Sequence, residues 1–278
     1  MQILFCIQLI TSFIAGGVFI AFLTFISEKV DARVSGIILA LPSTAALGFF
    51  FLGWSLSSEV VSYITPSSFI PLGLSVLFVA VYIYLANFMG RFINSKLLQI
   101  ILCTVVSLFV WFALAVPVIL YKINNLIVGI IGYGILITIT HWLLHRKNFK
   151  KPVSKMYSFK QKIGRSVFAG FMIALVVFFG KTLGPIWGSV FAVFPAAFLS
   201  SLMILHKYYN PENLFSTFQK IALGSITLLG YLLQVMLLFP LTGFAIGTVI
   251  AYAGSLIISF LLSKITFDKR RLQTSVYE

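Results

Sequence analysis

The sequence predicts an all-α, polytopic membrane protein with nine transmembrane helices. Eight of them form two inverted four-helix repeats, and the ninth connects the repeats (4+1+4). Three observations predict this fold: an apolar composition, a one-sided distribution of basic residues, and a short proline pattern that occurs twice, around Pro42 and around Pro195.

The composition establishes the membrane setting. Of 278 residues, 60% are hydrophobic and only 9% are charged, and the mean hydropathy is +1.07. A soluble domain of this length cannot carry that balance. A spanning helix needs about 20 apolar residues, and the sequence contains such stretches at 3–26, 35–55, 67–89, 97–121, 126–144, 165–181, 186–206, 217–239 and 241–263.

The last two spans come from one uncharged run, Ile221 to Ser263. A single helix of that length would measure about 65 Å, roughly twice the hydrocarbon thickness of a bilayer. Pro240 removes a backbone donor and Gly243 permits a tight turn. We therefore expect a hairpin at 239–243.

The basic residues support this count. With nine spans, eighteen of the 20 Lys and Arg residues fall on one side, and only Lys122 and Lys181 fall on the other. If the last apolar run were a single helix, giving eight spans, fourteen basic residues would lie on one side and six on the other. The positive-inside rule then predicts a bacterial-type inner membrane protein with its N-terminus outside and its C-terminus in the cytoplasm.

The net charge of +14 is explained by the same pattern. The densest basic stretch, 145–165, lies in a predicted cytoplasmic loop, where it would contact anionic membrane lipid. We expect no nucleic-acid partner.

Two halves of the chain align. Gly16 aligns with Gly170, and at an offset of 153 Pro42, Glu59 and Gly90 align with Pro195, Glu212 and Gly243. The predicted units are a first repeat (1–121), a connector helix with a basic loop (122–164), a second repeat (165–263) and a basic cytoplasmic tail (264–278). Equivalent spans are five steps apart in the chain, for example spans 1 and 6. Because five is odd, the second repeat is inverted, which is typical of many secondary transporters.

The prolines predict the place of a solute pathway. Each removes an intrahelical hydrogen bond and frees a carbonyl about a turn earlier, near Ile38 and Phe191. Freed backbone at membrane depth needs a protein or water partner, and interrupted helices at matching positions indicate a midplane site. The predicted pathway residues are Gly36, Pro42, Ser43, Thr44, Ser189, Pro195, Ala196 and Ala197. The alternative is that these small residues only pack helices together.

Glu59 and Glu212 precede predicted spans on opposite sides of the membrane, so they are candidate gate residues. The alternative is a pair of solvated helix starts, where the helix dipole favours a carboxylate. No charge lies at the middle of a predicted span. Since intramembrane charges are usually kept for function, we expect a weakly polar or uncharged solute.

Signals for catalysis are missing from the sequence. The three histidines, His141, His145 and His206, lie near the predicted cytoplasmic face. His141 and His145 are four residues apart, but no cysteine, aspartate or glutamate stands beside them to complete a metal site, and no glycine-rich phosphate loop occurs. We expect no enzyme activity, no metal and no cofactor.

The second proline segment, residues 188–202 followed by His206-Lys-Tyr-Tyr and Gly230-Tyr-Leu-Leu, resembles the small four-helix GlpM-like bacterial membrane proteins. Leu41-Pro42-Ser43-Thr44 is a shorter version. The resemblance implies a duplicated, fused form of that architecture, whose activity is poorly defined. The layout is also similar to fused small multidrug-resistance transporters and fused fluoride channels. However, the first span lacks the membrane glutamate of the transporters, and the pore motifs of the channels are absent.

Together these features predict a permease that moves a small solute by alternating access of two repeats. A passive channel and a non-transporting scaffold or lipid-binding protein are the alternatives. Membrane lipid and a small solute are the expected partners, and a homodimer is possible. The sequence leaves the solute, the direction of movement and the energy coupling open.

Overall fold

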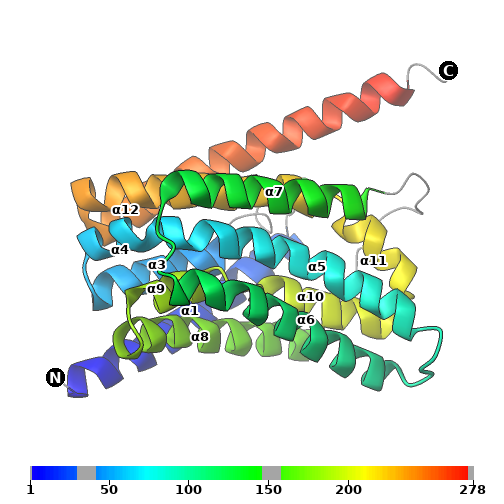
Figure 1. Cartoon of the computed structure of the whole chain (residues 1–278), viewed down its shortest axis with the longest axis horizontal. Coiled ribbons are helices and arrows are strands. Elements are labelled where there is room, and N and C mark those ends of the chain that lie inside the picture. The colour runs from blue at the N-terminus through cyan, green and yellow to red at the C-terminus, as the bar shows by residue number, and fades with distance from the viewer. Residues whose placement is uncertain (1, 30–41, 146–157, 275–278) are drawn as a thin grey trace.

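The computed structural model describes residues 2–29, 42–145 and 158–274. These residues form a bundle of helices (Figure 1). Its elements are α1 (Gln2–Lys29), α3 (Ser43–Ser55), α4 (Ser58–Ile64), the 3-10 turn η1 (Thr65–Ser68), α5 (Phe69–Met89), α6 (Lys96–Leu120), α7 (Leu126–Leu144), α8 (Phe159–Thr182), α9 (Pro185–Ala192), α10 (Ala196–Tyr208), α11 (Pro211–Phe218) and α12 (Ile221–Thr274).

Within the described part of the chain, seven helical segments are long and apolar enough to cross a membrane. They are Ile3–Ile26, Ser58–Met89, Lys96–Leu120, Leu126–Leu144, Phe159–Thr182, Pro185–Tyr208 and Ile221–Lys264. The chain is therefore an all-helical, multi-pass membrane protein.

The nine-span count is not confirmed. The predicted span at 35–55 is described only from Pro42 onward, and its helix α3 is shorter than a full span. The span predicted at 241–263 lies within α12, and so does the span predicted at 217–239 from Ile221 onward. By contrast, the spans predicted at 97–121 and 126–144 coincide with α6 and α7 to within one residue at either end.

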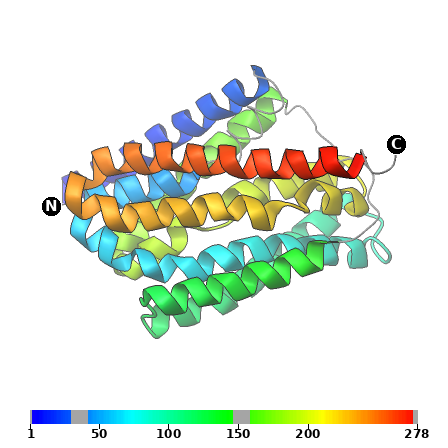
Figure 2. The same cartoon turned by 90° about the horizontal axis from the view of Figure 1, so that it is seen from above.

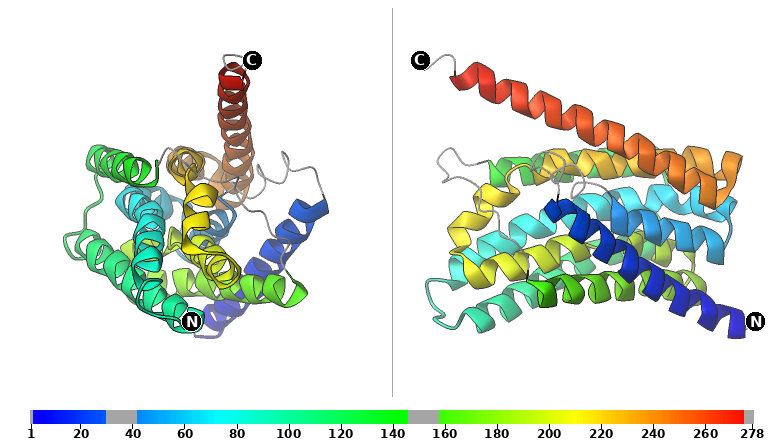
Figure 3. Two further views of the ribbon diagram at one scale, coloured as in Figure 1. Left: turned by 90° about the vertical axis from the view of Figure 1, so that its right-hand side faces the viewer. Right: turned by 180° about the vertical axis from the view of Figure 1, so that it is seen from behind.

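The expected turn in the last apolar run is present. Gly243 has non-helical angles (φ 77°, ψ 166°), and two helices meet there. This positive φ suits glycine, which has no Cβ to clash. The two arms of α12 fold back beside each other (Figure 2), and the second arm leads away from the bundle toward the C-terminus (Figure 3).

Helix α8 begins six residues before the predicted span at 165–181. Ser158 and Gln161 form a reciprocal capping box, in which each side chain accepts a hydrogen bond from the other residue's backbone N–H. As a result, Lys162 belongs to the helix and not to the predicted basic loop, and Arg165, the first residue of the predicted span, lies inside the helix.

The predicted interruption at Pro195 is confirmed. Helix α9 ends at Ala192, and α10 begins at Ala196 with Pro195 as its N-cap (φ −75°, ψ 40°). Pro42 caps α3 in nearly the same conformation (φ −75°, ψ 44°). The short helices that follow, α4 and α11, also begin 153 residues apart, at Ser58 and Pro211. Two separate elements therefore repeat at the offset found in the sequence.

Helices α1 and α8 lie side by side in opposite directions (Figures 2 and 3). Phe5 stacks on Phe178, whereas Phe25, near the other end of α1, contacts Phe159. The two backbones approach closely because Gly170 has no side chain. A Cβ at Gly170 would lie 2.4 Å from the carbonyl oxygen of Phe13.

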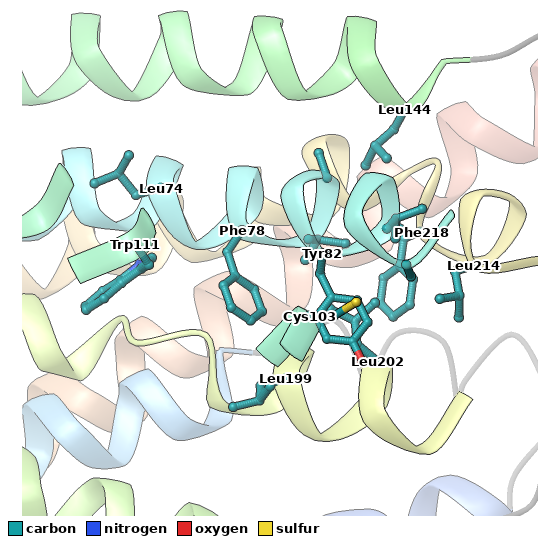
Figure 4. Close-up of a cluster of buried hydrophobic side chains, with 14 of the residues drawn as sticks. Leu74, Phe78, Tyr82, Cys103, Trp111, Leu144, Leu199, Leu202, Leu214 and Phe218 are labelled. Carbon is teal, nitrogen blue, oxygen red and sulfur yellow. The ribbon is translucent and has the colours of Figure 1, made fainter. Parts of the chain in front are cut away.

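The core places the helix breaks in the protein interior. One buried cluster, which includes Phe78, Tyr82, Trp111 and Leu202, joins α5 and α6 to α10 (Figure 4). A second cluster joins α3 and α9 to α12. Only 17% of the apolar stretch is buried inside the protein in α1 and in α7, compared with 61% in the α9–α10 segment. The outer helices therefore present apolar side chains to lipid, while the interrupted helix is enclosed.

Candidate functional site

The first turns of α3 and α10 meet at one small cavity. Its volume is about 80 Å³, and its lining combines Ser43 and Thr44 from α3 with Ala196, Ala197 and Ser200 from α10. Helices α1 and α8 complete the wall with Ile20, Leu23, Thr24, Arg165, Phe168 and Ala169. Residues from both halves of the sequence thus surround one site.

The prolines determine how these helix ends are presented. Proline fixes φ near −65° and has no N–H, so it can cap a helix but cannot continue one from the preceding turn. The carbonyls of Pro42 and Pro195 accept the first helical hydrogen bonds, from Ala46 N–H (2.7 Å) and Leu199 N–H (2.8 Å). Neither helix has a side-chain cap. The first residues of both helices line the cavity, and the Ala196 N–H donates to the Phe194 carbonyl (2.8 Å).

Helix α12 packs against one side of this site. The hydroxyls of Ser43 and Tyr252 lie 3.0 Å apart in a hydrogen bond, and Ser43 is only 9% exposed. The Tyr252 ring also makes an edge contact with Phe19 of α1. Tyr252 therefore links the second arm of α12 to the wall of the cavity.

The interruption between α9 and α10 is satisfied by protein groups. The Ser75 hydroxyl of α5 donates to the Val193 carbonyl (2.6 Å), and the indole N–H of Trp111 donates to the Ser75 oxygen (3.0 Å). The freed carbonyl was expected near Phe191. The Phe191 carbonyl itself accepts from the Phe194 N–H at 3.0 Å, and the Val193 carbonyl, two residues later, is the one that Ser75 satisfies. The chain tightens by one residue at the break and shifts the freed carbonyl to Val193. Ile38 lies outside the described residues.

Arg165 is one of the lining residues that were not among the predicted pathway residues. The sequence predicts it at the junction of a basic cytoplasmic stretch and a span, but α8 begins at Phe159 and carries it to the cavity. It is the one charged residue among those that line the site. The signal that would have found it is the capping box Ser158-x-x-Gln161, which indicates an earlier helix start.

Half of the predicted pathway residues line the cavity. Ser43, Thr44, Ala196 and Ala197 do so, and Pro42 and Pro195 cap the helices that carry them. Gly36 lies outside the described residues.

Ser189 is not among the residues that line the cavity. It is fully buried, and its hydroxyl donates to the Ile64 carbonyl (3.1 Å) and accepts from Ser67 (3.2 Å). Nearby, a Cβ at Gly48 would lie 3.2 Å from the Ala192 Cβ. This part of the small-residue stripe packs helices together, as the alternative interpretation expected.

The candidate gate residues lie at equivalent places in the fold but away from the cavity. Glu59 and Glu212 occupy the first turns of α4 and α11, and both side chains are exposed. The positive end of a helix dipole stabilises a carboxylate there. Their role as gates stays a prediction.

Of the three histidines, His206 differs from the other two because it is fully buried. Its Nε2 donates to the Gln99 side-chain oxygen (3.1 Å), and its Nδ1 lies 3.2 Å from the Tyr82 hydroxyl. An amide oxygen only accepts, so the neutral ring leaves Nδ1 to accept from Tyr82. His206 therefore ties the end of α10 to α5 and α6.

A family described as a protein of unknown function (DUF3147) matches residues 162–271. This segment runs from the first turn of α8 into the second arm of α12, and so corresponds to the second predicted repeat. No curated protein and no solved structure matches the chain. The match does not confirm the resemblance to GlpM-like proteins.

Proposed function

We propose that this multi-pass membrane protein is a permease that moves a small, weakly polar or uncharged solute by alternating access of two inverted repeats. The convergence of Ser43 and Thr44 with Ala196 and Ala197 on one cavity carries this proposal. Interrupted helices at matching positions of two repeats form the solute sites of many secondary transporters.

Three findings support the inverted 4+1+4 arrangement. Two pairs of helices begin at the same offset, α3 with α10 and α4 with α11. The equivalent helices α1 and α8 are antiparallel, as an axis in the membrane plane requires. The family match covers the second repeat by itself, which suits a fused duplication.

The cavity wall indicates the chemistry of the solute. The described lining is mixed: it carries the hydroxyls of Thr44 and Ser200 and the charged side chain of Arg165 beside small apolar residues. The Ser200 hydroxyl donates to the Ala197 carbonyl (3.1 Å). A small, weakly polar or uncharged solute fits this lining. The volume of about 80 Å³ is far below the roughly 300–1,000 Å³ of a drug-sized pocket. The solute is therefore small, or the cavity widens during transport.

Flux into liposomes tests the proposal. Stopped-flow light scattering would follow uptake of glycerol, urea, acetate and choline by proteoliposomes, a panel that separates neutral, anionic and cationic solutes. We expect saturable flux of at least one of them. Ala197→Phe fills the cavity from its exposed side and should abolish that flux. Ala113→Phe, at an exposed position of α6, is the matched control.

The outcomes separate the three functions. Flux that fails to saturate, or single-channel current, would identify a passive channel. Equal flux for wild type and Ala197→Phe would contradict a path through this cavity. If no solute in a broadened panel moves, and the protein instead co-purifies with a stable partner, the scaffold interpretation replaces the permease.

A second measurement needs no known substrate. In a background lacking Cys6 and Cys103, Ala197→Cys should react with a membrane-impermeant thiol reagent from both sides of the membrane if the site alternates. Reaction from one side only would contradict alternating access.

A further inference from the structure

A second hollow lies on the opposite side of the α1–α8 pair from the solute cavity. It is a groove of about 290 Å³ whose lining includes Phe13, Val18 and Ala21 of α1 with Lys162 and Val167 of α8. It shares no residue with the cavity, which uses other positions of the same two helices. The groove is open to the surroundings, since Val18 is 64% and Val167 51% exposed.

Glycines create this groove. At Gly17 a Cβ would lie 3.2 Å from the Ser166 carbonyl oxygen, and at Gly170 a Cβ would lie 2.4 Å from the Phe13 carbonyl oxygen. The two backbones therefore touch along a line without side chains. The larger side chains on either side of that line form the walls, so a long, shallow hollow remains between them.

The chemistry of the groove is apolar along its length and cationic at one end. Ser166 is its one hydroxyl residue, and that hydroxyl donates to the Lys162 carbonyl (2.9 Å). The Lys162 ammonium lies 4.8 Å from the centre of the Phe25 ring. Lys162 lies near the start of α8, beside the basic stretch that the positive-inside rule assigns to the cytoplasmic face.

The length of the groove matches one leaflet of a bilayer. On α1 its lining runs from Phe13 to Phe25, a distance of about 18 Å at 1.5 Å per residue. Half of the hydrocarbon core measures about 15 Å. An occupant that begins at Lys162 at the interface therefore ends close to the bilayer midplane.

We propose that this groove is a binding site for an anionic phospholipid of the cytoplasmic leaflet. One acyl chain lies along the line where the backbones of α1 and α8 touch at Gly17 and Gly170, and the phosphate of the headgroup pairs with Lys162. The acyl chain of such a lipid matches the apolar walls and the one-leaflet length of the groove, and its phosphate matches the cationic end. The proposal depends on membrane insertion and not on the permease function.

A second copy of the chain fits this face less well. A two-fold axis along the membrane normal would bring the Lys162 residues of both copies to the same level of the membrane. Like charges then repel where the lipid phosphate would attract. Dimer formation through this face is therefore an outcome that contradicts the proposal.

Native mass spectrometry of the detergent-purified protein tests the site. Phosphatidylglycerol, phosphatidylcholine and free glycerol phosphate would be added in parallel. We expect phosphatidylglycerol to bind in preference to phosphatidylcholine, and glycerol phosphate not to bind. Lys162→Gln should lower the affinity for phosphatidylglycerol about fivefold, the equivalent of about 1 kcal/mol for one basic residue near a lipid headgroup.

Two variants fill the groove from different helices, Ala21→Phe and Val167→Trp, and each should remove the bound lipid. Lys207→Gln and Ala113→Phe are the matched controls. Like Lys162, Lys207 places its ammonium over an aromatic ring, that of Tyr208, but it lies outside the groove. Far-UV circular dichroism and gel filtration would confirm folding.

Unchanged phosphatidylglycerol binding in both groove-filling variants would overturn the proposal. Equal binding of glycerol phosphate would assign a phosphate site without a lipid chain. A dimer that Ala21→Phe converts to a monomer would assign the face to a second copy. A protein inactive in every flux assay would still bind the lipid, so this test and the test of transport fail independently.

Discussion

The Ser75 hydroxyl donates a hydrogen bond to the carbonyl of Val193, across the packing of α5 against the interrupted helix. Val193 lies two residues before Pro195, at the point where the regular hydrogen bonds of α9 end. A bare carbonyl in this environment would cost several kcal/mol. One serine on a neighbouring helix therefore makes the interruption stable.

Replacing Ser75 with alanine should destabilise the protein by about 1–2 kcal/mol, because both the Val193 carbonyl and the Trp111 indole lose their partner. Unfolding of the detergent-solubilised protein would measure the change. Ser255→Ala is the control: Ser255 is equally buried, but its hydroxyl bonds only within its own helix. Equal stability of the two variants would show that the Ser75 contact contributes nothing specific.

Gly170 should tolerate no side chain. Gly170→Ala places a Cβ 2.4 Å from the Phe13 carbonyl oxygen, so α1 must shift, at a cost of about 1–3 kcal/mol. Gly164→Ala in the same helix meets no atom within 4 Å and should stabilise the protein by about 0.5–1 kcal/mol. Thermal unfolding of both variants compares them, and a neutral Gly170→Ala would contradict the close packing of α1 on α8.

His206 should matter more than the other histidines. His206→Leu leaves Tyr82 and Gln99 without their shared partner in a buried place, which should cost about 2 kcal/mol of unfolding free energy. His141→Leu, at an exposed position, should stay within about 0.5 kcal/mol of wild type. The prediction fails if the two variants have the same midpoint of unfolding.

The topology can be read from fusions. A fluorescent protein folds in the cytoplasm, whereas alkaline phosphatase becomes active outside. We expect fluorescence from a fusion at the C-terminus, and phosphatase activity from an insertion beside Lys122. The reason is that eighteen of the 20 basic residues fall on the predicted cytoplasmic side, and only Lys122 and Lys181 on the outer side. Phosphatase activity at both places would contradict the nine-span topology.

Much of the fold followed from hydropathy. The limits of α6 and α7 were predicted to within one residue, because each is a long apolar stretch between polar turns. The turn at Gly243 and the interruption at Pro195 were also predicted, because proline and glycine act locally on the backbone. The start of α8 was misplaced, because the hydropathy window followed apolar residues and passed over the cap at Ser158.

The candidate site was predicted only in part, for a related reason. Ser43 and Thr44 could be paired with Ala196 and Ala197 because the two segments align in the sequence. Arg165 was missed because the hydropathy pattern passed over the helix cap at Ser158. Ser189 was predicted to lie on the pathway, but the side of the helix that it occupies cannot be read from an apolar stretch. Ser189 packs against Ile64, whereas Arg165 reaches the cavity.

The sequence by itself determined that the chain is a helical membrane protein, that a short proline pattern occurs in it twice, and that Pro195 interrupts a helix. Those properties depend on composition and on local backbone chemistry. Only the tertiary structure decided which residues meet: Ser75 with Val193, the first turns of α3 and α10 at one cavity, and α1 with α8 around a lipid-sized groove. Those contacts depend on how closely helices approach, which small residues such as Gly170 permit but hydropathy does not encode.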